Sequence, residues 1–160
     1  MLDFYRPGAL QKQKTNIVDL IDKVLALLEK QLSTQGVEVI QDYEANLPEL
    51  RVVSNQIQQV FFNLVLNAME VMQEGGKLSI SAKVNGSHLW VEFQDTGPGV
   101  ASEIQDTIFE PFVSLNEDGT GLGLSVSFGI LTAHGGSLEL VQNKKKGACF
   151  RVMIPLEVSQ

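Results

Sequence analysis

Cysteine is almost absent from this chain, since Cys149 is the single thiol among 160 residues. One cysteine cannot form an intrachain disulfide, and it cannot supply the several thiolates of a cysteine zinc site. Its neighbours Ala148, Phe150 and Val152 are apolar or small. We therefore expect Cys149 to be a small core residue in a reducing compartment.

Basic charge is also scarce. The net charge is −7, whereas a nucleic-acid footprint needs clustered lysines and arginines. The one basic run, Lys144–Lys146, precedes a glycine between two strand-like segments and is typical of a solvated turn. The composition therefore predicts no nucleic-acid partner.

Long apolar runs are missing as well. No stretch approaches the roughly 20 apolar residues of a membrane span, and no charged segment leads into an apolar one at the N-terminus. We expect a soluble, cytoplasmic segment; a membrane anchor elsewhere in a longer protein stays open.

The length of 160 residues fits one domain, which can bury about 70% of its unfolded surface.

Hydrophobic periodicity predicts a first helix from Asp19 to a stop at Gly36. Its apolar positions recur every three or four residues and are Leu20, Val24, Leu27, Leu28 and Leu32. A strand follows over 37–41, and a shorter one over 50–53.

A second helix is predicted over 55–73, where Ser54 or Asn55 can cap the first turn and Gly75-Gly76 ends the last. Its apolar stripe comprises Ile57, Val60, Phe61, Leu64, Ala68, Val71 and Met72. Asn63 and Asn67 lie together on one shoulder of this stripe.

Alternating residues over 77–84 and 89–93 predict a hairpin with its turn at Asn85-Gly86. The same alternation places Asp95 on the apolar face, where a carboxylate needs a partner or a ligand. After a loop over 96–118 with one short helical turn, we expect a helix from Gly119 to Ala133, stopped by Gly135-Gly136. Strands over 137–142 and 148–154 close the domain.

Two glycine-rich strings, 95–99 and 119–124, suggest a nucleotide pocket. Asp95 offers a fixed acceptor for an exocyclic amine such as that of adenine, and the glycines after it let the backbone approach a base. The second string opens a helix whose N–H groups can face phosphates. Taken alone, each string could equally be a tight turn or a hinge, and the pair Asn63 and Asn67 could be plain core polar residues.

The combination resembles the catalytic domain of sensor histidine kinases, within the ATPase group that includes gyrase, MutL and heat-shock chaperones. Residues 59–68 resemble the N box, 95–99 the first G box, 109–112 the F box and 119–123 the second G box. The residues that follow the F box are similar to those of nitrogen-regulation-type kinases. The resemblance implies an α+β fold, a two-layer α/β sandwich with a mixed, mostly antiparallel sheet covered on one face by three helices.

The resemblance also implies ATP and Mg²⁺ as ligands. Asp95 would bind the adenine amine, and Asn67 would be the principal magnesium ligand with Asn63 beside it. A lid over about 99–119 would be anchored by Phe109 and Phe112. The implied nucleotide-binding residues are Asn63, Asn67, Asp95, Gly97, Gly99, Phe109, Phe112, Gly119, Thr120, Gly121, Leu122 and Gly123.

The residue at position 63 distinguishes members of this group that hydrolyse ATP from those that transfer its γ-phosphoryl group. The hydrolysing members have a glutamate base there, whereas this chain has Asn63, so we expect transfer of the γ-phosphoryl to a histidine instead of steady hydrolysis. An ATP hydrolase and a nucleotide-sensing scaffold without transfer remain the alternatives. Glu70 and the acidic Glu117 and Asp118 stand where relatives often carry cations, which predicts modest ATP affinity.

The phosphoacceptor histidine is not expected in this chain, because His88 and His134 both fall at structural positions. Residues 1–14 resemble a linker or the end of a dimerisation helix, and 15–160 would be the ATP-binding catalytic domain. The implied partners are the dimerisation and phosphoacceptor domain of the same kinase and a response regulator. We expect this fragment to be monomeric, the full-length kinase to be a homodimer, and the fragment not to phosphorylate itself.

Overall fold

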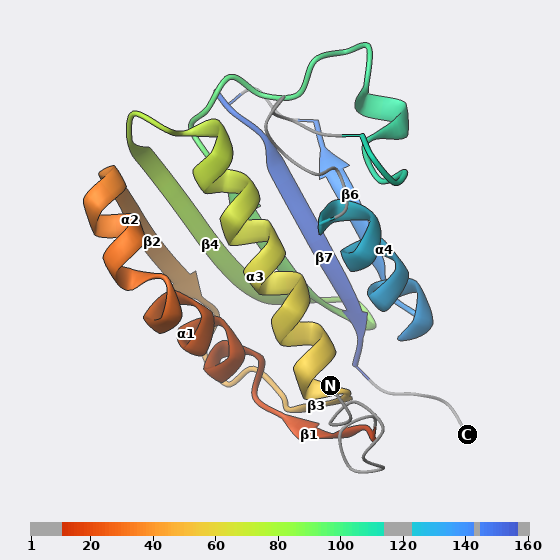
Figure 1. Cartoon of the computed structure of the whole chain (residues 1–160). Coiled ribbons are helices and arrows are strands. Elements are labelled where there is room, and N and C mark those ends of the chain that lie inside the picture. The colour runs from red at the N-terminus through yellow and green to blue at the C-terminus, as the bar shows by residue number, and fades with distance from the viewer. Residues whose placement is uncertain (1–10, 114–122, 143–144, 157–160) are drawn as a thin grey trace, which may run out of the picture.

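The computed structural model describes residues 11–113, 123–142 and 145–156. They form two layers, a five-stranded sheet with helices packed on one of its faces (Figure 1). The strands of this sheet are β2 (Val37–Tyr43), β4 (Gly76–Asn85), β5 (His88–Gln94), β6 (Ser137–Val141) and β7 (Cys149–Pro155). The helices are α1 (Ile17–Leu27), α2 (Glu29–Gln35), α3 (Ser54–Val71) and α4 (Gly123–Ala133).

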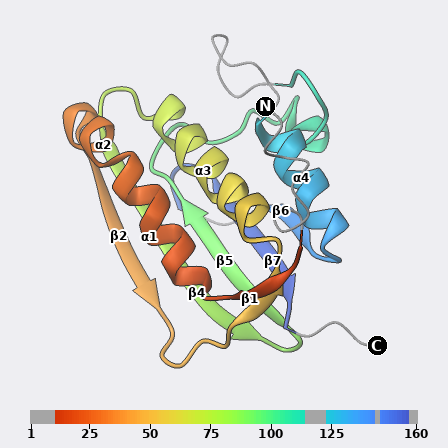
Figure 2. The same ribbon diagram turned by 60° about the horizontal axis from the view of Figure 1, so that its bottom comes forward.

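The sheet has the strand order β2-β4-β5-β7-β6. β2 runs parallel to β4, and every other pairing in this sheet is antiparallel, which confirms the predicted mixed, mostly antiparallel sheet. A separate antiparallel pair joins β1 (Gln13–Thr15) to β3 (Leu50–Val52). Figure 2 shows this pair near the first turn of α3.

The core lies between the helices and the sheet. Alternate residues of β4 and β5 point into it, and the Phe61 ring of α3 lies 5.7 Å from the Phe93 ring of β5. The predicted parity of the hairpin is therefore confirmed. Cys149 is buried as expected, and burial raises the pKa of its thiol to about 11, so the thiol stays protonated at neutral pH.

The first predicted helix is broken into α1 and α2 at Leu28, whose φ is −105° and ψ 7°. Leu27, assigned to the apolar stripe, is 61% exposed. The stripe follows Val24, Leu28 and Leu32 at intervals of four residues, and Leu27 lies to one side of it, rotated by about 100° from Leu28. α1 and α2 together occupy the place of the single predicted helix, and Gly36 ends α2 with φ 82° as expected.

The predicted cap of α3 was wrong. Val53 is the N-cap and makes no side-chain cap hydrogen bond, and the Ser54 hydroxyl instead pairs with that of Thr15 at 2.6 Å. The Val53 N–H donates to Nε2 of His134 at 3.1 Å. His134, at the end of α4, thus satisfies the N–H of the cap residue, and no side chain caps the first turn of α3.

The hairpin turn lies one residue further along than predicted. Asn85 pairs with His88, so Gly86 and Ser87 form the two-residue loop, and Gly86 takes φ 63°. Near the N-terminus, β1 starts at Gln13, two residues before Thr15, where we expected the catalytic domain to begin.

Within the described residues, no helix has the length and apolar character to cross a membrane.

Candidate functional site

Asp95 follows β5 and is only 4% exposed, as the strand parity predicted. Its Oδ1 accepts hydrogen bonds from the N–H groups of Gly97 at 2.9 Å and Ala148 at 3.0 Å. Its own N–H donates to the Ala148 carbonyl at 2.9 Å. The other oxygen, Oδ2, makes no hydrogen bond within the described part of the chain and is not sealed from solvent.

Burial raises the pKa of Asp95, while the N–H groups of Ala148 and Gly97 act in the opposite direction. The two N–H hydrogen bonds therefore offset only part of the cost of burying the charged carboxylate. A donor placed against Oδ2 would complete its hydrogen bonding, so Asp95 is suited to bind an amine or amide N–H.

Gly147 lies directly against Asp95, a contact that the sequence analysis did not predict. Its φ is 96°, and a Cβ there would overlap the backbone carbonyl of Asp95 and lie 2.7 Å from Oδ1. Only glycine permits this approach. The Lys144–Lys146 run before Gly147 signalled a turn, but no local pattern linked that turn to Asp95.

Gly97 and Gly99 need glycine for different reasons. A Cβ on Gly97 would lie 2.9 Å from the carbonyl oxygen of Val71, so the loop touches the end of α3 directly. Gly99 instead takes φ 84°, which a side chain rarely tolerates. The predicted base-pocket glycines thus lie beside Asp95.

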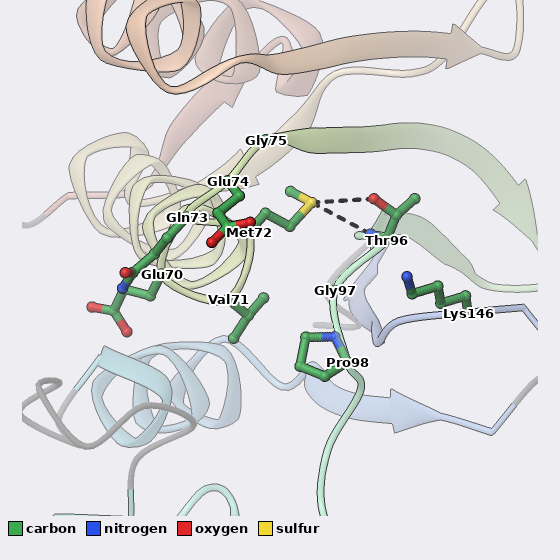
Figure 3. A pocket seen from close by; sticks show the side chains of 10 residues that line it. All are labelled: Glu70, Val71, Met72, Gln73, Glu74, Gly75, Thr96, Gly97, Pro98 and Lys146. Carbon is green, nitrogen blue, oxygen red and sulfur yellow. Dashed lines mark hydrogen bonds between the residues drawn. The ribbon is translucent and has the colours of Figure 1, made fainter.

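An open cleft of about 620 Å³ lies between the end of α3, the loop after Asp95 and the β6–β7 turn. Figure 3 shows Val71 and Pro98 across it, with the Met72 sulfur pointing at Thr96. That sulfur accepts from the N–H and Oγ1 of Thr96 at 3.4 and 3.5 Å. The size lies within the usual range of small-molecule sites.

Glu70 lines the same cleft, and burial raises the pKa of its carboxyl. Lys146 faces the cleft from the β6–β7 turn. The cleft therefore carries groups of both charges at its mouth.

The two asparagines of α3 differ in their partners. Asn63 is 9% exposed and fully engaged, because its Oδ1 accepts from Gln59 and its Nδ2 donates to Gly123 O and Ser127 Oγ. Asn67 Nδ2 is buried and has no hydrogen-bond partner among the described residues. An amide that no described residue holds can turn its oxygen toward a cation, so Asn67 fits the magnesium role that the sequence suggested.

The two F-box phenylalanines also differ. The Phe109 ring stacks on Phe128 of α4 at 5.3 Å and meets the edge of Phe150 of β7 at 6.2 Å. Phe112 is 77% exposed at φ 70°. The expectation that both rings anchor this segment therefore does not hold for Phe112, which no described residue buries, whereas Phe109 packs against α4 and β7.

Four predicted phosphate-binding residues, Gly119, Thr120, Gly121 and Leu122, lie outside the described residues. Gly123 is the first described residue of α4, and a Cβ on it would lie 3.8 Å from Asn63. Within the described ranges, no group of three or more His, Cys, Asp or Glu side chains could hold a metal ion. A cation here would need amide oxygens and the oxygens of its ligand.

Comparisons with known proteins agree with this geometry. The family model described as "Histidine kinase-, DNA gyrase B-, and HSP90-like ATPase" matches residues 52–158. Sporulation kinase A of Bacillus subtilis (strain 168) is 35% identical over 144 residues, which cover 90% of this chain and 24% of that kinase. The sensory histidine kinase/phosphatase NtrB of Vibrio alginolyticus is 34% identical over 163 residues, which cover 94% of this chain and 45% of NtrB. The chain thus spans less than half the length of these curated relatives.

Solved structures match over most of the chain. The catalytic domain of histidine kinase ThkA superposes with a TM-score of 0.84 at 29% identity, covering 92% of this chain and 97% of that domain. Full-length ShkA in complex with AMPPNP gives a TM-score of 0.81 at 27% identity, covering 94% of this chain and 32% of ShkA. ThkA in complex with the response regulator protein TrrA gives 0.80 at 27% identity, covering 98% of this chain and 45% of that chain. The chain therefore belongs to the histidine kinase-, DNA gyrase B- and HSP90-like ATPase family, and it is an ATP-binding domain of the histidine kinase type.

Proposed function

We propose that this chain binds ATP with Mg²⁺ and presents the γ-phosphoryl group to a histidine on a dimerisation domain outside the chain. The phosphoryl would then pass to an aspartate of a response regulator. The observation that carries the proposal is Asp95, a buried carboxyl with one oxygen held by two backbone N–H groups and the other without a described partner.

The half-satisfied carboxyl supports an adenine site. The exocyclic amine of adenine is a donor that can reach Oδ2, and a base bound at Gly97 would lie against backbone instead of side chains. The hydrogen bonds to Oδ1 fix the orientation of the carboxyl before any ligand arrives. The AMPPNP bound by the structural relative ShkA supports the same ligand class.

Asn67 supports a magnesium site one helical turn beyond Asn63. Magnesium uses few protein oxygens and takes its other ligands from water and phosphates, so one amide oxygen is a sufficient protein contribution. When bound, the ion would neutralise charge on the phosphates during transfer.

Transfer is favoured over hydrolysis by the chemistry at position 63. An amide cannot accept a proton from water, and the Asn63 amide is already occupied by three hydrogen bonds. Both ring nitrogens of the buried His134 are also engaged, with Ile130 O at 2.8 Å and Val53 N at 3.1 Å. An acceptor outside this chain is therefore the better candidate.

The partners follow from this proposal. The phosphoacceptor domain of the same kinase and a response regulator would act with this domain, as the complex of the relative ThkA with TrrA suggests. The fragment would be a monomer and the full-length kinase a homodimer. Residues 1–14 would connect to the dimerisation helices, and 99–119 would be the lid.

The test is calorimetric titration of the chain with AMPPNP, with and without Mg²⁺. We expect micromolar, magnesium-enhanced binding that Asp95→Asn abolishes and that Asn67→Ala makes weak or insensitive to Mg²⁺. Asp42→Asn, at an exposed position of β2 outside the proposed site, is the matched control and should bind like the wild type. A folded wild-type protein that binds no AMPPNP would contradict the proposal, and rapid turnover of ATP without an acceptor would favour a hydrolase.

A further inference from the structure

The Asn63 side chain is locked in one orientation. Gln59, one turn earlier on α3, donates to Oδ1 at 3.0 Å. Nδ2 donates to the Gly123 carbonyl and the Ser127 hydroxyl, each at 3.1 Å. Because both amide hydrogens are used and the oxygen already accepts a bond, rotating this amide would break three hydrogen bonds in a site shielded from water.

The Asn63 Oδ1 atom faces Gln59 and not Asn67, with which it would have to share a metal ion. It accepts from Gln59, one turn toward the start of α3, whereas Asn67 lies one turn toward the end. Asn67 carries the buried Nδ2 without a described partner. Of the two amides, only that of Asn67 is uncommitted.

The partners of Asn63 belong to the first turns of α4. Gly123 is the first described residue of this helix, and Ser127, fully buried, lies one turn further on. The far end of α4 is attached to α3 through His134 and the Val53 N–H. α4 is therefore fixed to α3 at both ends, and Asn63 holds the end that is one turn of α3 away from Asn67.

We propose that Asn63 is a positioning residue and not a magnesium ligand, holding the start of α4 at a fixed place relative to Asn67. Gln59 orients the amide, and Ser127 with the Gly123 carbonyl receives its hydrogens. This inference rests on the proposed nucleotide site, in which α4 and Asn67 serve the phosphates and Asp95 serves the base. It assigns different tasks to two asparagines that the sequence treats as a pair.

Aspartate substitutions separate the two roles. A metal ligand tolerates aspartate, which keeps an oxygen and adds charge. A donor does not, because a carboxylate has no hydrogens for Gly123 O and Ser127 Oγ and repels the carbonyl oxygen. We expect Asn63→Asp to weaken Mg²⁺–AMPPNP binding by about tenfold or more, from loss of buried hydrogen bonds, while Asn67→Asp remains magnesium-dependent.

Adenosine binding distinguishes a shift of α4 from damage to the whole fold. Adenosine lacks phosphates, so it would use only the base end of the site. We expect adenosine affinity, measured by NMR chemical shifts, to change by less than about twofold in Asn63→Asp, since Asp95 is not altered. Ser127→Ala removes one acceptor of Asn63 without adding charge, and should weaken AMPPNP but not adenosine. Gly129→Ala is the control on α4, because a Cβ at Gly129 meets nothing within 4 Å.

The outcomes are distinct. Weaker AMPPNP with unchanged adenosine in Asn63→Asp and Ser127→Ala supports the inference. Unchanged or stronger magnesium-dependent binding by Asn63→Asp, or wild-type binding by Ser127→Ala, overturns it while leaving the proposed function intact. A folded wild-type protein that binds no AMPPNP overturns both.

Discussion

The two ends of the candidate site are built in different ways. At the end proposed to bind the base, backbone groups of the β5 and β7 ends hold Asp95, and Gly147 approaches it too closely for any side chain. At the end proposed to face the phosphates, side chains hold α4 to α3 through Asn63, and Phe109 packs against α4 and β7. The base end is thus part of the sheet, whereas the phosphate end depends on contacts between separate elements.

This difference has a consequence for stability. A side chain that crowds the backbone of Asp95 must disturb strand pairing, because the backbone hydrogen bond of Asp95 continues the β5–β7 ladder. A change at the phosphate end can shift a helix and leave the sheet intact. Crowding the base end should therefore lower the free energy of unfolding together with ligand affinity. Substitutions at the phosphate end should lower ligand affinity and leave the sheet folded.

The largest expected effect is that of Gly147→Ala. The added Cβ meets both the backbone and the carboxyl of Asp95, at a φ of 96°, so overpacking and backbone strain should together cost about 3 kcal/mol or more. Urea unfolding measures this loss, and AMPPNP binding should be lost with it.

The matched control is Gly86→Ala, in the hairpin turn. Its φ of 63° imposes similar backbone strain, but a Cβ there meets nothing within 4 Å, so the cost should be only about 1 kcal/mol. If both substitutions lower the free energy of unfolding equally, contact of the new Cβ with Asp95 adds nothing to the cost of Gly147→Ala.

A smaller effect is expected for His134→Leu, which removes the attachment of the far end of α4. Leucine has no acceptor for the Val53 N–H, and an unpaired buried donor costs about 1 to 3 kcal/mol. Thermal unfolding should record the loss while adenosine binding by the folded protein persists. The control is His88→Leu in the hairpin; a comparable loss there would contradict the importance of the His134 hydrogen bonds.

The smallest expected effect concerns pH. Burial raises the pKa of Asp95 above its ordinary value of 3.8, so the folded state binds this proton more readily than the unfolded state. Its contribution to stability is greatest below that ordinary value and is lost as the pH rises through the raised pKa. At pH 7, Asp95→Asn should therefore be more stable than the wild type, although we expect it to bind no nucleotide.

Thermal unfolding of both proteins from pH 4 to pH 8 checks this sign, with Asp106→Asn as the exposed control. The advantage of Asp95→Asn should shrink toward pH 4. A wild-type protein that is more stable than Asp95→Asn at pH 7 would show that its backbone hydrogen bonds outweigh the cost of burial.

Local patterns predicted the elements well where one face of an element is buried. The alternation of β4 and β5 correctly placed Asp95 inside, and the helical stripe correctly identified α3. One error lies where a residue far along the chain satisfies the backbone at the start of a helix. The Val53 N–H takes His134 as its acceptor, which no local capping rule could predict.

By itself, the sequence determined the order of the elements, the burial of Asp95 and the family motifs, because hydrophobic periodicity and glycine spacing are local properties of the chain. The tertiary structure alone decided that Gly147 supports Asp95, that Asn63 and Asn67 have different partners, and that Phe109 is packed while Phe112 is exposed. These features arise from contacts between residues far apart in the chain. They depend on how closely separate elements approach one another once they are packed, which residue patterns do not encode.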